Sequence, residues 1–222
     1  MSAAGETGPQ RRAQLTRQRV VAAAIELADR DGIESISMRK LAPELGVEAM
    51  SLYTHVRNKD DLLDGMVDAV ISQIPVGAER VDWKTALRRL ALAARAVVLR
   101  HPWAPRTIES RTTPGPAAMR YINTVLGILR EGGFSLAQTH HALHILGSRV
   151  LGFTQAIFDD SGDVDPQTAA TIASQLGATL PYVAEMALAA AHTGALGPCD
   201  DDAEFAFALD FILDGLARLQ SR

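Results

Sequence analysis

The chain has 222 residues, 47% of them hydrophobic, which is enough for a small domain and a larger one, each with its own core. It contains no run of the roughly 18 apolar residues that span a membrane, and its first dozen residues hold no signal-peptide block. The single cysteine, Cys199, excludes an internal disulfide and gives no support for a thiolate metal site. We therefore expect a cytoplasmic protein.

The formal net charge of −4 argues against a protein that coats nucleic acid with its whole surface, but it hides a basic N-terminal part. Residues 1–59 carry nine Lys and Arg against seven Asp and Glu, whereas residues 60–222 carry 13 against 19. Four of the nine precede the first apolar stripe and fit either a solvated tail or an arm that contacts phosphate: Arg11, Arg12, Arg17 and Arg19.

Helical periodicity covers nearly the whole chain, and strand-like alternation is missing, so we expect an all-α fold. Capping residues and glycines predict four helices in the first third: one capped by Thr16 and stopped by Gly32, one from Met38 to Leu45, one from Glu48 to His55, and one from Asn58 to Ile74. Proline, glycine and acidic separators predict six more, at about 84–100, 104–110, 116–131, 135–158, 167–193 and 203–220.

The second and third helices are short and are joined by a tight turn at Gly46, so the first and fourth must hold them in place. In a DNA-binding helix-turn-helix, the second helix of such a pair lies in the major groove. Here that helix turns Val47, Leu52 and Val56 toward the core and offers small and hydroxyl side chains on its other side. These residue types alone fit a short packing helix as well as a DNA-reading one.

From Leu15 to Ala69 the chain resembles the DNA-binding domain of the tetracycline-repressor (TetR) family. The resemblance is carried by an ordered set of motifs: Asp31-Gly32-Ile33-Glu34, Ser37-Met38-Arg39-Lys40-Leu41-Ala42, Leu45-Gly46-Val47, Ser51-Leu52-Tyr53-Thr54-His55-Val56 and Asn58-Lys59-Asp60-Asp61-Leu62-Leu63. It extends more weakly to Glu131-Gly132-Gly133-Phe134-Ser135-Leu136, to Leu180-Pro181 and to the helix from Phe205 to Leu219.

The resemblance implies a repressor that binds duplex operator DNA. Arg39 matches a residue that contacts a base edge, and Lys59 matches a lysine that meets phosphate. With the neighbouring positions, the implied DNA-binding set is Arg39, Lys40, Ala49, Met50, Ser51, Tyr53, Thr54, His55 and Lys59. Ala49 and Met50 differ from the tetracycline repressor itself, so we expect a different operator.

The family also implies a homodimer held by two C-terminal helices from each subunit. The predicted helix 203–220 agrees, since its apolar stripe is too wide for a single contact: Phe205, Ala208, Leu209, Ile212, Leu213, Leu216 and Leu219. An ordinary core within one chain is the alternative use of this stripe. Arg149, among apolar residues, faces either an acidic ligand or the dimer interface.

The tetracycline repressor binds its drug through magnesium, with a histidine and a glutamate whose positions are Glu109 and Ala156 here. We therefore expect no cofactor, no metal, and a partly apolar small-molecule ligand of another kind. His140 and His144 lie one helical turn apart, a spacing that can hold a metal, but a third ligand is missing. The candidate ligand-binding residues are Trp103, Glu109, Arg111, Ile122, Val125, His140, Leu143, His144 and Phe153.

We thus interpret residues 1–60 as a DNA-binding domain with an N-terminal arm, and residues 61–222 as a domain for ligand binding and dimerisation. The expected function is repression at a palindromic operator, relieved by a small-molecule inducer. An activator with the same fold is one alternative. A helical enzyme or carrier without DNA binding is another, although no nucleophile elbow or phosphate-binding glycine loop is present.

Overall fold

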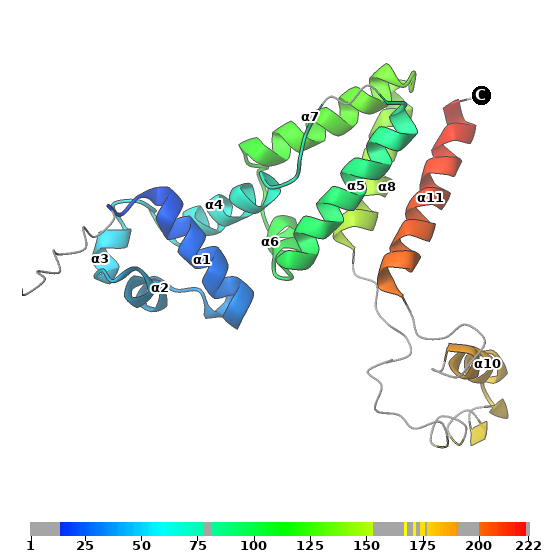
Figure 1. The fold of residues 1–222 in the computed structure, drawn as a ribbon, viewed down its shortest axis with the longest axis horizontal. Helices are drawn as coiled ribbons and strands as arrows, with labels where there is room; N and C mark the ends of the chain where they lie inside the picture. Colours follow the sequence, from blue (N-terminus) through cyan, green and yellow to red (C-terminus); the bar gives the residue numbers. More distant parts are fainter. Residues whose placement is uncertain are drawn as a thin grey trace, which may run out of the picture. The chain divides into compact units, whose positions relative to one another are not determined.

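The structure is a computed structural model of the chain, and it describes residues 14–77, 81–152, 167, 171, 174–175, 177–190 and 200–220. Every regular element within these residues is a helix (Figure 1), which confirms the all-α fold. None of the described helices combines the length and the apolar character that a membrane crossing needs.

The first helix, α1 (Arg17–Asp31), begins where the sequence predicts, because the Thr16 hydroxyl accepts the backbone N–H of Arg19. It ends at Gly32, whose φ of 81° lies in the region that glycine tolerates best. Its buried residues form one stripe at helical spacing: Val20, Val21, Ala24, Leu27 and Ala28.

One 3₁₀ turn, η1 (Ile33–Ser35), leads to α2 (Met38–Leu45), which is capped by the Ser37 hydroxyl. Gly46 then adopts the left-handed conformation, with φ 65° and ψ 35°, and turns the chain into the next helix. The short pair of helices is therefore joined as the sequence predicts.

The helix α3 (Ala49–Leu52) is shorter than the predicted span from Glu48 to His55. The N–H groups of Tyr53 and His55 bond to carbonyls three residues back, so the chain leaves α-helical geometry and continues as turns. The helix predicted to lie in the major groove is consequently one α-helical turn, Ala49–Leu52, followed by tighter turns over residues 53–55.

The helix α4 (Lys59–Ile71) begins at Asn58, whose side-chain oxygen accepts the backbone N–H of Asp61 at 2.8 Å. Asp60 and Asp61 stand in its first turn, where the helix dipole favours negative charge. Its buried residues hold it against α1: Leu62, Met66, Val67, Val70 and Ile71.

Three further helices match their predicted spans closely: α5 (Trp83–Arg100), α6 (Ala104–Glu109) and α7 (Pro116–Glu131). After them come α8 (Leu136–Leu151), α10 (Pro181–Ala190) and α11 (Asp201–Gln220). The last part of the predicted helix 135–158 lies outside the described residues.

The predicted single helix over 167–193 is wrong in one respect. Residues 178 and 179 form a turn, and α10 starts afresh at Pro181. Proline has no N–H to donate to the preceding turn, so it begins a helix more readily than it continues one.

The helices α8 and α11 lie side by side and run antiparallel (Figure 1). Near the start of α8, Gln138 Nε2 donates to the carbonyl of Leu219 at 2.8 Å. Near its end, Arg149 donates to the carbonyl of Glu204 at 3.0 Å, and its guanidinium carbon lies 4.9 Å from the centre of the Phe205 ring. Arg149 is therefore part of a contact within one chain.

The chain divides into two compact units, Met1–Ala78 with Ala93–Thr124, and Glu79–Leu92 with Val125–Arg222. The first unit contains α1 to α4 and α6, and the second contains α8 and α11. The predicted division between residues 60 and 61 concerns function and stays a prediction.

Candidate nucleic-acid interface and ligand site

The two sides of α3 differ sharply in exposure. Leu52 and Val56 are buried, as predicted, whereas Val47, also predicted to face the core, is half-buried. On the other side, Met50 is 74% exposed and Tyr53 is 47% exposed. Large apolar and aromatic side chains left in solvent on a short helix are a surface available for a partner.

The other residues of this segment that are predicted to contact DNA are small or polar. Ser51 and Thr54 are exposed, and the Thr54 hydroxyl donates to the Ser51 carbonyl at 2.7 Å, so that its lone pairs remain available as acceptors. Ala49 and His55 are half-buried. The face therefore combines short side chains, which permit close approach, with hydroxyl groups that can bond to bases or phosphates.

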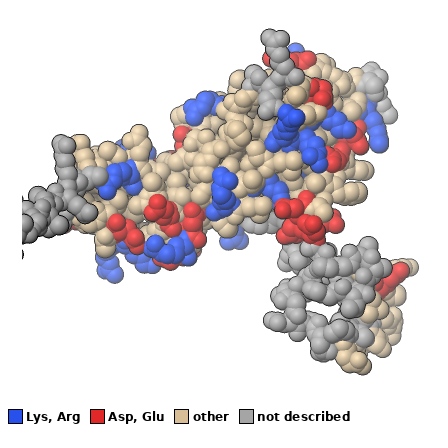
Figure 2. Space-filling model, viewed as in Figure 1, with Lys and Arg blue, Asp and Glu red and all other residues tan. Residues whose placement is uncertain are grey.

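Three predicted DNA contacts are cations: Arg39 and Lys40 in the first turn of α2, and Lys59 at the first position of α4. All three are exposed, and none forms an ion pair with a residue that the structure describes. Each keeps its charge available for an anionic partner. Figure 2 shows that Lys and Arg are interspersed with Asp and Glu on the face turned to the viewer, so basic surface is scattered there.

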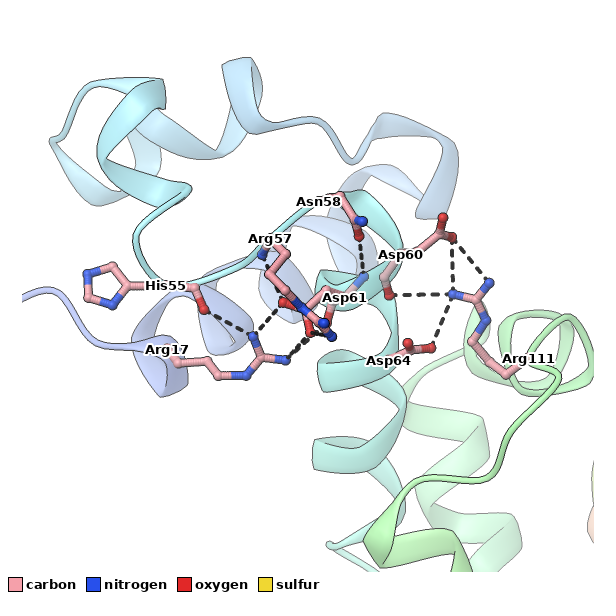
Figure 3. Close-up of polar contacts among 8 residues, drawn as sticks. All are labelled: Arg17, His55, Arg57, Asn58, Asp60, Asp61, Asp64 and Arg111. Atoms are coloured by element: carbon pink, nitrogen blue, oxygen red, sulfur yellow. Dashed lines mark hydrogen bonds and ion pairs between the residues drawn. The ribbon is translucent and has the colours of Figure 1, made fainter.

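Arg17, predicted as part of a tail or phosphate-contacting arm, is instead bound to the start of α4 (Figure 3). Its two terminal nitrogens lie 2.9 and 3.0 Å from the carboxylate oxygens of Asp61, and one of them also donates to the His55 carbonyl at 3.0 Å. The backbone N–H of Arg57 completes the set at 2.9 Å from Asp61. Arg17 thus connects α1 both to His55, in the turn after α3, and to Asp61, in the first turn of α4.

The hydrogen bonds around Asp61 determine whether its carboxyl group is protonated. The hydrogen bonds from Arg17, followed by the N–H of Arg57, lower the pKa of Asp61 from 3.8 to about 2. Asp61 therefore stays ionised and holds Arg17 and the turn after α3 under all ordinary conditions. Sequence reasoning missed it because Arg17 and Asp61 are 44 residues apart.

The predicted ligand-binding residues divide between the two compact units. The first unit contains Trp103, Glu109, Arg111 and Ile122, and the second contains Val125, His140, Leu143 and His144. Phe153 and Ala156 lie outside the described residues. Ligand binding by this set stays a prediction.

Two of these residues contact the helices of the predicted DNA-binding head. Trp103 is buried, and its ring N–H donates to Asp29 of α1 at 2.6 Å; Asp29 also lies 2.9 Å from His101 Nδ1. Arg111, in the segment after α6, forms ion pairs with Asp60 and Asp64 of α4. Residues chosen as candidates for a cavity therefore also join the two ends of α6 to α1 and α4.

The three histidines of α8 are exposed and close to one another. The ring centres of His140 and His144 are 4.6 Å apart, and those of His140 and His141 are 5.6 Å apart. Across the described part of the chain, no group of three or more His, Cys, Asp or Glu could hold a metal ion. The pair on α8 thus has no third protein ligand among these residues.

The first unit also has a surface hollow of about 410 Å³ between α1 and α4. Arg17, Val21 and Ile25 line it from α1, and Gly65 and Ala69 line it from α4. The hollow contains none of the predicted ligand-binding residues, so it is a different place from the expected cavity.

Two family models match the chain and together cover most of it. The model "Bacterial regulatory proteins, tetR family" matches residues 20–66, and "Tetracyclin repressor-like, C-terminal domain" matches residues 75–219. The chain belongs to the TetR family.

Similar proteins extend over nearly the full length of this TetR-family chain. It is 34% identical over 210 residues to the HTH-type transcriptional repressor DrrR1 of Streptomyces coeruleorubidus, covering 91% of this chain and 77% of that protein. It is 30% identical to the class A tetracycline repressor from transposon 1721 of Escherichia coli, covering 90% and 89%.

Solved structures of TetR-family proteins share its fold. The TetR family protein ActR of Streptomyces coelicolor, in complex with (S)-DNPA, has a TM-score of 0.71 at 28% identity and covers 92% of this chain and 98% of that one. ActR in complex with actinorhodin has a TM-score of 0.69 at 27% identity, covering 95% and 100%. Both of these ActR structures contain a small organic molecule.

The protein is thus a TetR-family transcriptional repressor with an N-terminal DNA-binding helix-turn-helix, and it is not an enzyme. This assignment sets aside the alternative of a helical enzyme or carrier. Membership of this family means that the chain recognises operator DNA and small-molecule ligands.

Proposed function

We propose that this repressor binds a near-palindromic operator as a homodimer and is released from it by a small, partly apolar molecule. The observation that carries the proposal is the outer face of α3. Exposed Met50 and Tyr53 project there, and the cations Arg39 and Lys59 have no ion-pair partner among the described residues. A surface of this kind is suited to a polyanion with readable edges.

Within this proposal the residues divide into two roles. Arg39 reads a base edge, because a guanidinium can bond to both acceptors of guanine in the major groove. Lys59 contacts phosphate at the start of α4 and fixes the position of the head on the duplex. The other proposed DNA-facing residues line the groove: Lys40, Ala49, Met50, Ser51, Tyr53, Thr54 and His55.

The homodimer is supported by the outer face of α11. Phe207 and Phe211 are 72% and 71% exposed and lie one turn apart, whereas Leu209 and Leu213 are buried within the chain. Two adjacent exposed aromatic rings on one helix are costly in water and typical of an interface. A second copy would also supply the second reading head, which a palindrome requires about 34–36 Å away along the duplex.

The inducer acts by shifting a population. A ligand that binds better to the arrangement that cannot span two grooves lowers operator affinity by its differential affinity for that arrangement. The ActR structures with bound organic molecules support a ligand of this general class, and the predicted ligand-binding residues remain our candidates for its site. Because the target is genomic DNA, we place the protein in the cytoplasm.

Selection from a pool of random duplexes tests the DNA-binding proposal. The protein should enrich a near-palindromic sequence, and its affinity for that duplex should fall steeply with salt as counterions are released. Light scattering on the complex should give two chains per duplex. Enrichment of no symmetric sequence, or one chain per bound duplex, would contradict the proposal.

A further inference from the structure

One face of α4 carries carboxylates at intervals of four residues: Asp60, Asp64 and Asp68. This spacing places them in one row along the helix. All three contact the segment from Arg111 to Ala117, between α6 and the first turn of α7. The row is therefore a docking face for a single stretch of chain in the same compact unit.

Arg111 joins the first two carboxylates (Figure 3). Both of its terminal nitrogens lie 3.3 Å from Asp60 Oδ1, and one of them lies 3.3 Å from Asp64 Oδ1. The Arg111 side chain is only 20% exposed, and its Nε is buried without an acceptor among the described residues. A guanidinium buried to this extent depends on these two aspartates for compensation of its charge.

The third carboxylate holds the other end of the segment. Asp68 Oδ1 accepts the backbone N–H of Ala117 at 2.6 Å, in the first turn of α7. A Cβ at Gly115 would lie 2.6 Å from the same oxygen, so a larger residue there would displace the Asp68 carboxylate from this position. The segment is consequently fixed to α4 at both ends.

We propose that Arg111, with Asp60 and Asp64, forms a latch that holds α4 in the position and charge state needed to bind DNA. The inference rests on the proposed function, because it concerns how Lys59 meets phosphate. Asp60 adjoins Lys59 in sequence, and Asp64 lies one turn further along α4. Arg111 therefore acts as a positioning residue for the DNA interface, without contacting DNA itself.

The direction of the effect follows from charge as well as from position. Without Arg111, two uncompensated carboxylates would stand near the phosphate-facing end of α4 and would repel the duplex. Asp61 would not take part, because Arg17 and Arg57 already engage it. Loss of Arg111 weakens DNA binding, and removal of one of the unpaired carboxylates restores part of the affinity.

The test measures dissociation constants for the duplex recovered by selection, in the absence of any ligand. Arg111→Gln should weaken binding about five- to tenfold. Arg111→Lys keeps the positive charge but loses the planar guanidinium that contacts both aspartates. Its dissociation constant should lie between those of Arg111→Gln and the wild type. Asp64→Asn should change binding less than Arg111→Gln, and adding it to Arg111→Gln should recover part of the loss.

A matched control is Arg88→Gln, which breaks an ion pair with Asp210 in the other unit and should leave DNA affinity unchanged. Thermal unfolding of every variant separates loss of position from loss of fold. The latch is overturned if Arg111→Gln binds as the wild type does, or if its effect and that of Asp64→Asn simply add. If the wild type itself recovers no duplex, the proposed function fails instead.

Discussion

The start of α4 and the outer face of α11 differ in whether their side chains find partners within a single chain. In α4 every carboxylate of the first turns has a partner in the same unit, and no large apolar side chain is exposed. In α11, Asp210 and Asp214 also pair within the chain, with Arg88 and Lys84. The side chains of Phe207 and Phe211, however, stay largely exposed among the residues that the structure describes, so α11 leaves two aromatic rings in solvent where α4 leaves no large apolar side chain.

We expect the largest effects from substitutions in α11, where the buried and the exposed apolar residues should affect different properties. Leu213→Ala removes a fully buried side chain and should lower the free energy of unfolding by about 2–5 kcal/mol. Phe211→Asp, at an exposed position, should leave the fold intact but shift the protein from dimer to monomer. Chemical denaturation measures the first effect and light scattering the second.

The opposite result would place the interface elsewhere. If Phe211→Asp stays dimeric, the outward face of α11 is not where two copies meet. If Leu213→Ala dissociates the dimer without loss of stability, the inner face is less essential to the core than its burial indicates.

A second pair of substitutions addresses the DNA-facing side of α2 and α4. Arg39→Ala should cost about 1–3 kcal/mol on the selected operator and hardly change non-specific binding. Lys59→Ala should weaken binding to all duplexes about equally and reduce the salt slope by roughly one. Titrations at several salt concentrations, on operator and on random duplex, distinguish them; equal losses on both duplexes for Arg39→Ala would remove its base-reading role.

The smallest effect concerns the pH dependence of α4. Because the pKa of Asp61 is about 2 in the folded chain and 3.8 otherwise, its contribution is fully present above about pH 4. It is lost as the pH falls through 2. With screening around the half-exposed Arg17, we expect about 1–2 kcal/mol, seen as the difference in unfolding free energy between wild type and Asp61→Asn.

The corresponding substitution in α11 is a matched control. Asp210 also has its pKa lowered by an arginine, Arg88, but both side chains are more exposed than Asp61. Asp210→Asn should therefore change the unfolding free energy less. An equal or larger effect at Asp210 would mean that burial does not distinguish the two ion pairs.

The sequence predicts local structure well, since a helix start depends on residues within one turn. Thr16 caps the helix that it is expected to cap, and Ser37 and Asn58 cap the two helices predicted to begin at Met38 and at Asn58. Gly46 turns left-handed where the pair of short helices requires it. The DNA-binding head could therefore be outlined from pattern and resemblance together.

Contacts between distant residues could not be read in the same way. The wide apolar stripe of the last helix leaves two uses open in the sequence, a dimer interface and a core within one chain, and Phe205, Leu209, Leu213 and Leu216 are buried within the chain. Leu219, at the end of the stripe, is 43% exposed, and Phe207 and Phe211, which lie outside the stripe, are more exposed still. Periodicity finds an apolar helix with two candidate faces, and only the position of α8 decides which face is inner.

The hydrogen bond between Asp68 and Ala117 also joins two parts of the chain that are synthesised at different times. Its two residues are 49 positions apart, so forming the bond requires closing a long loop, which costs conformational entropy. A chain made from its N-terminus releases α4 well before α7. The contact can therefore form only after α7 has been synthesised, and until then Asp68 has no Ala117 N–H to accept.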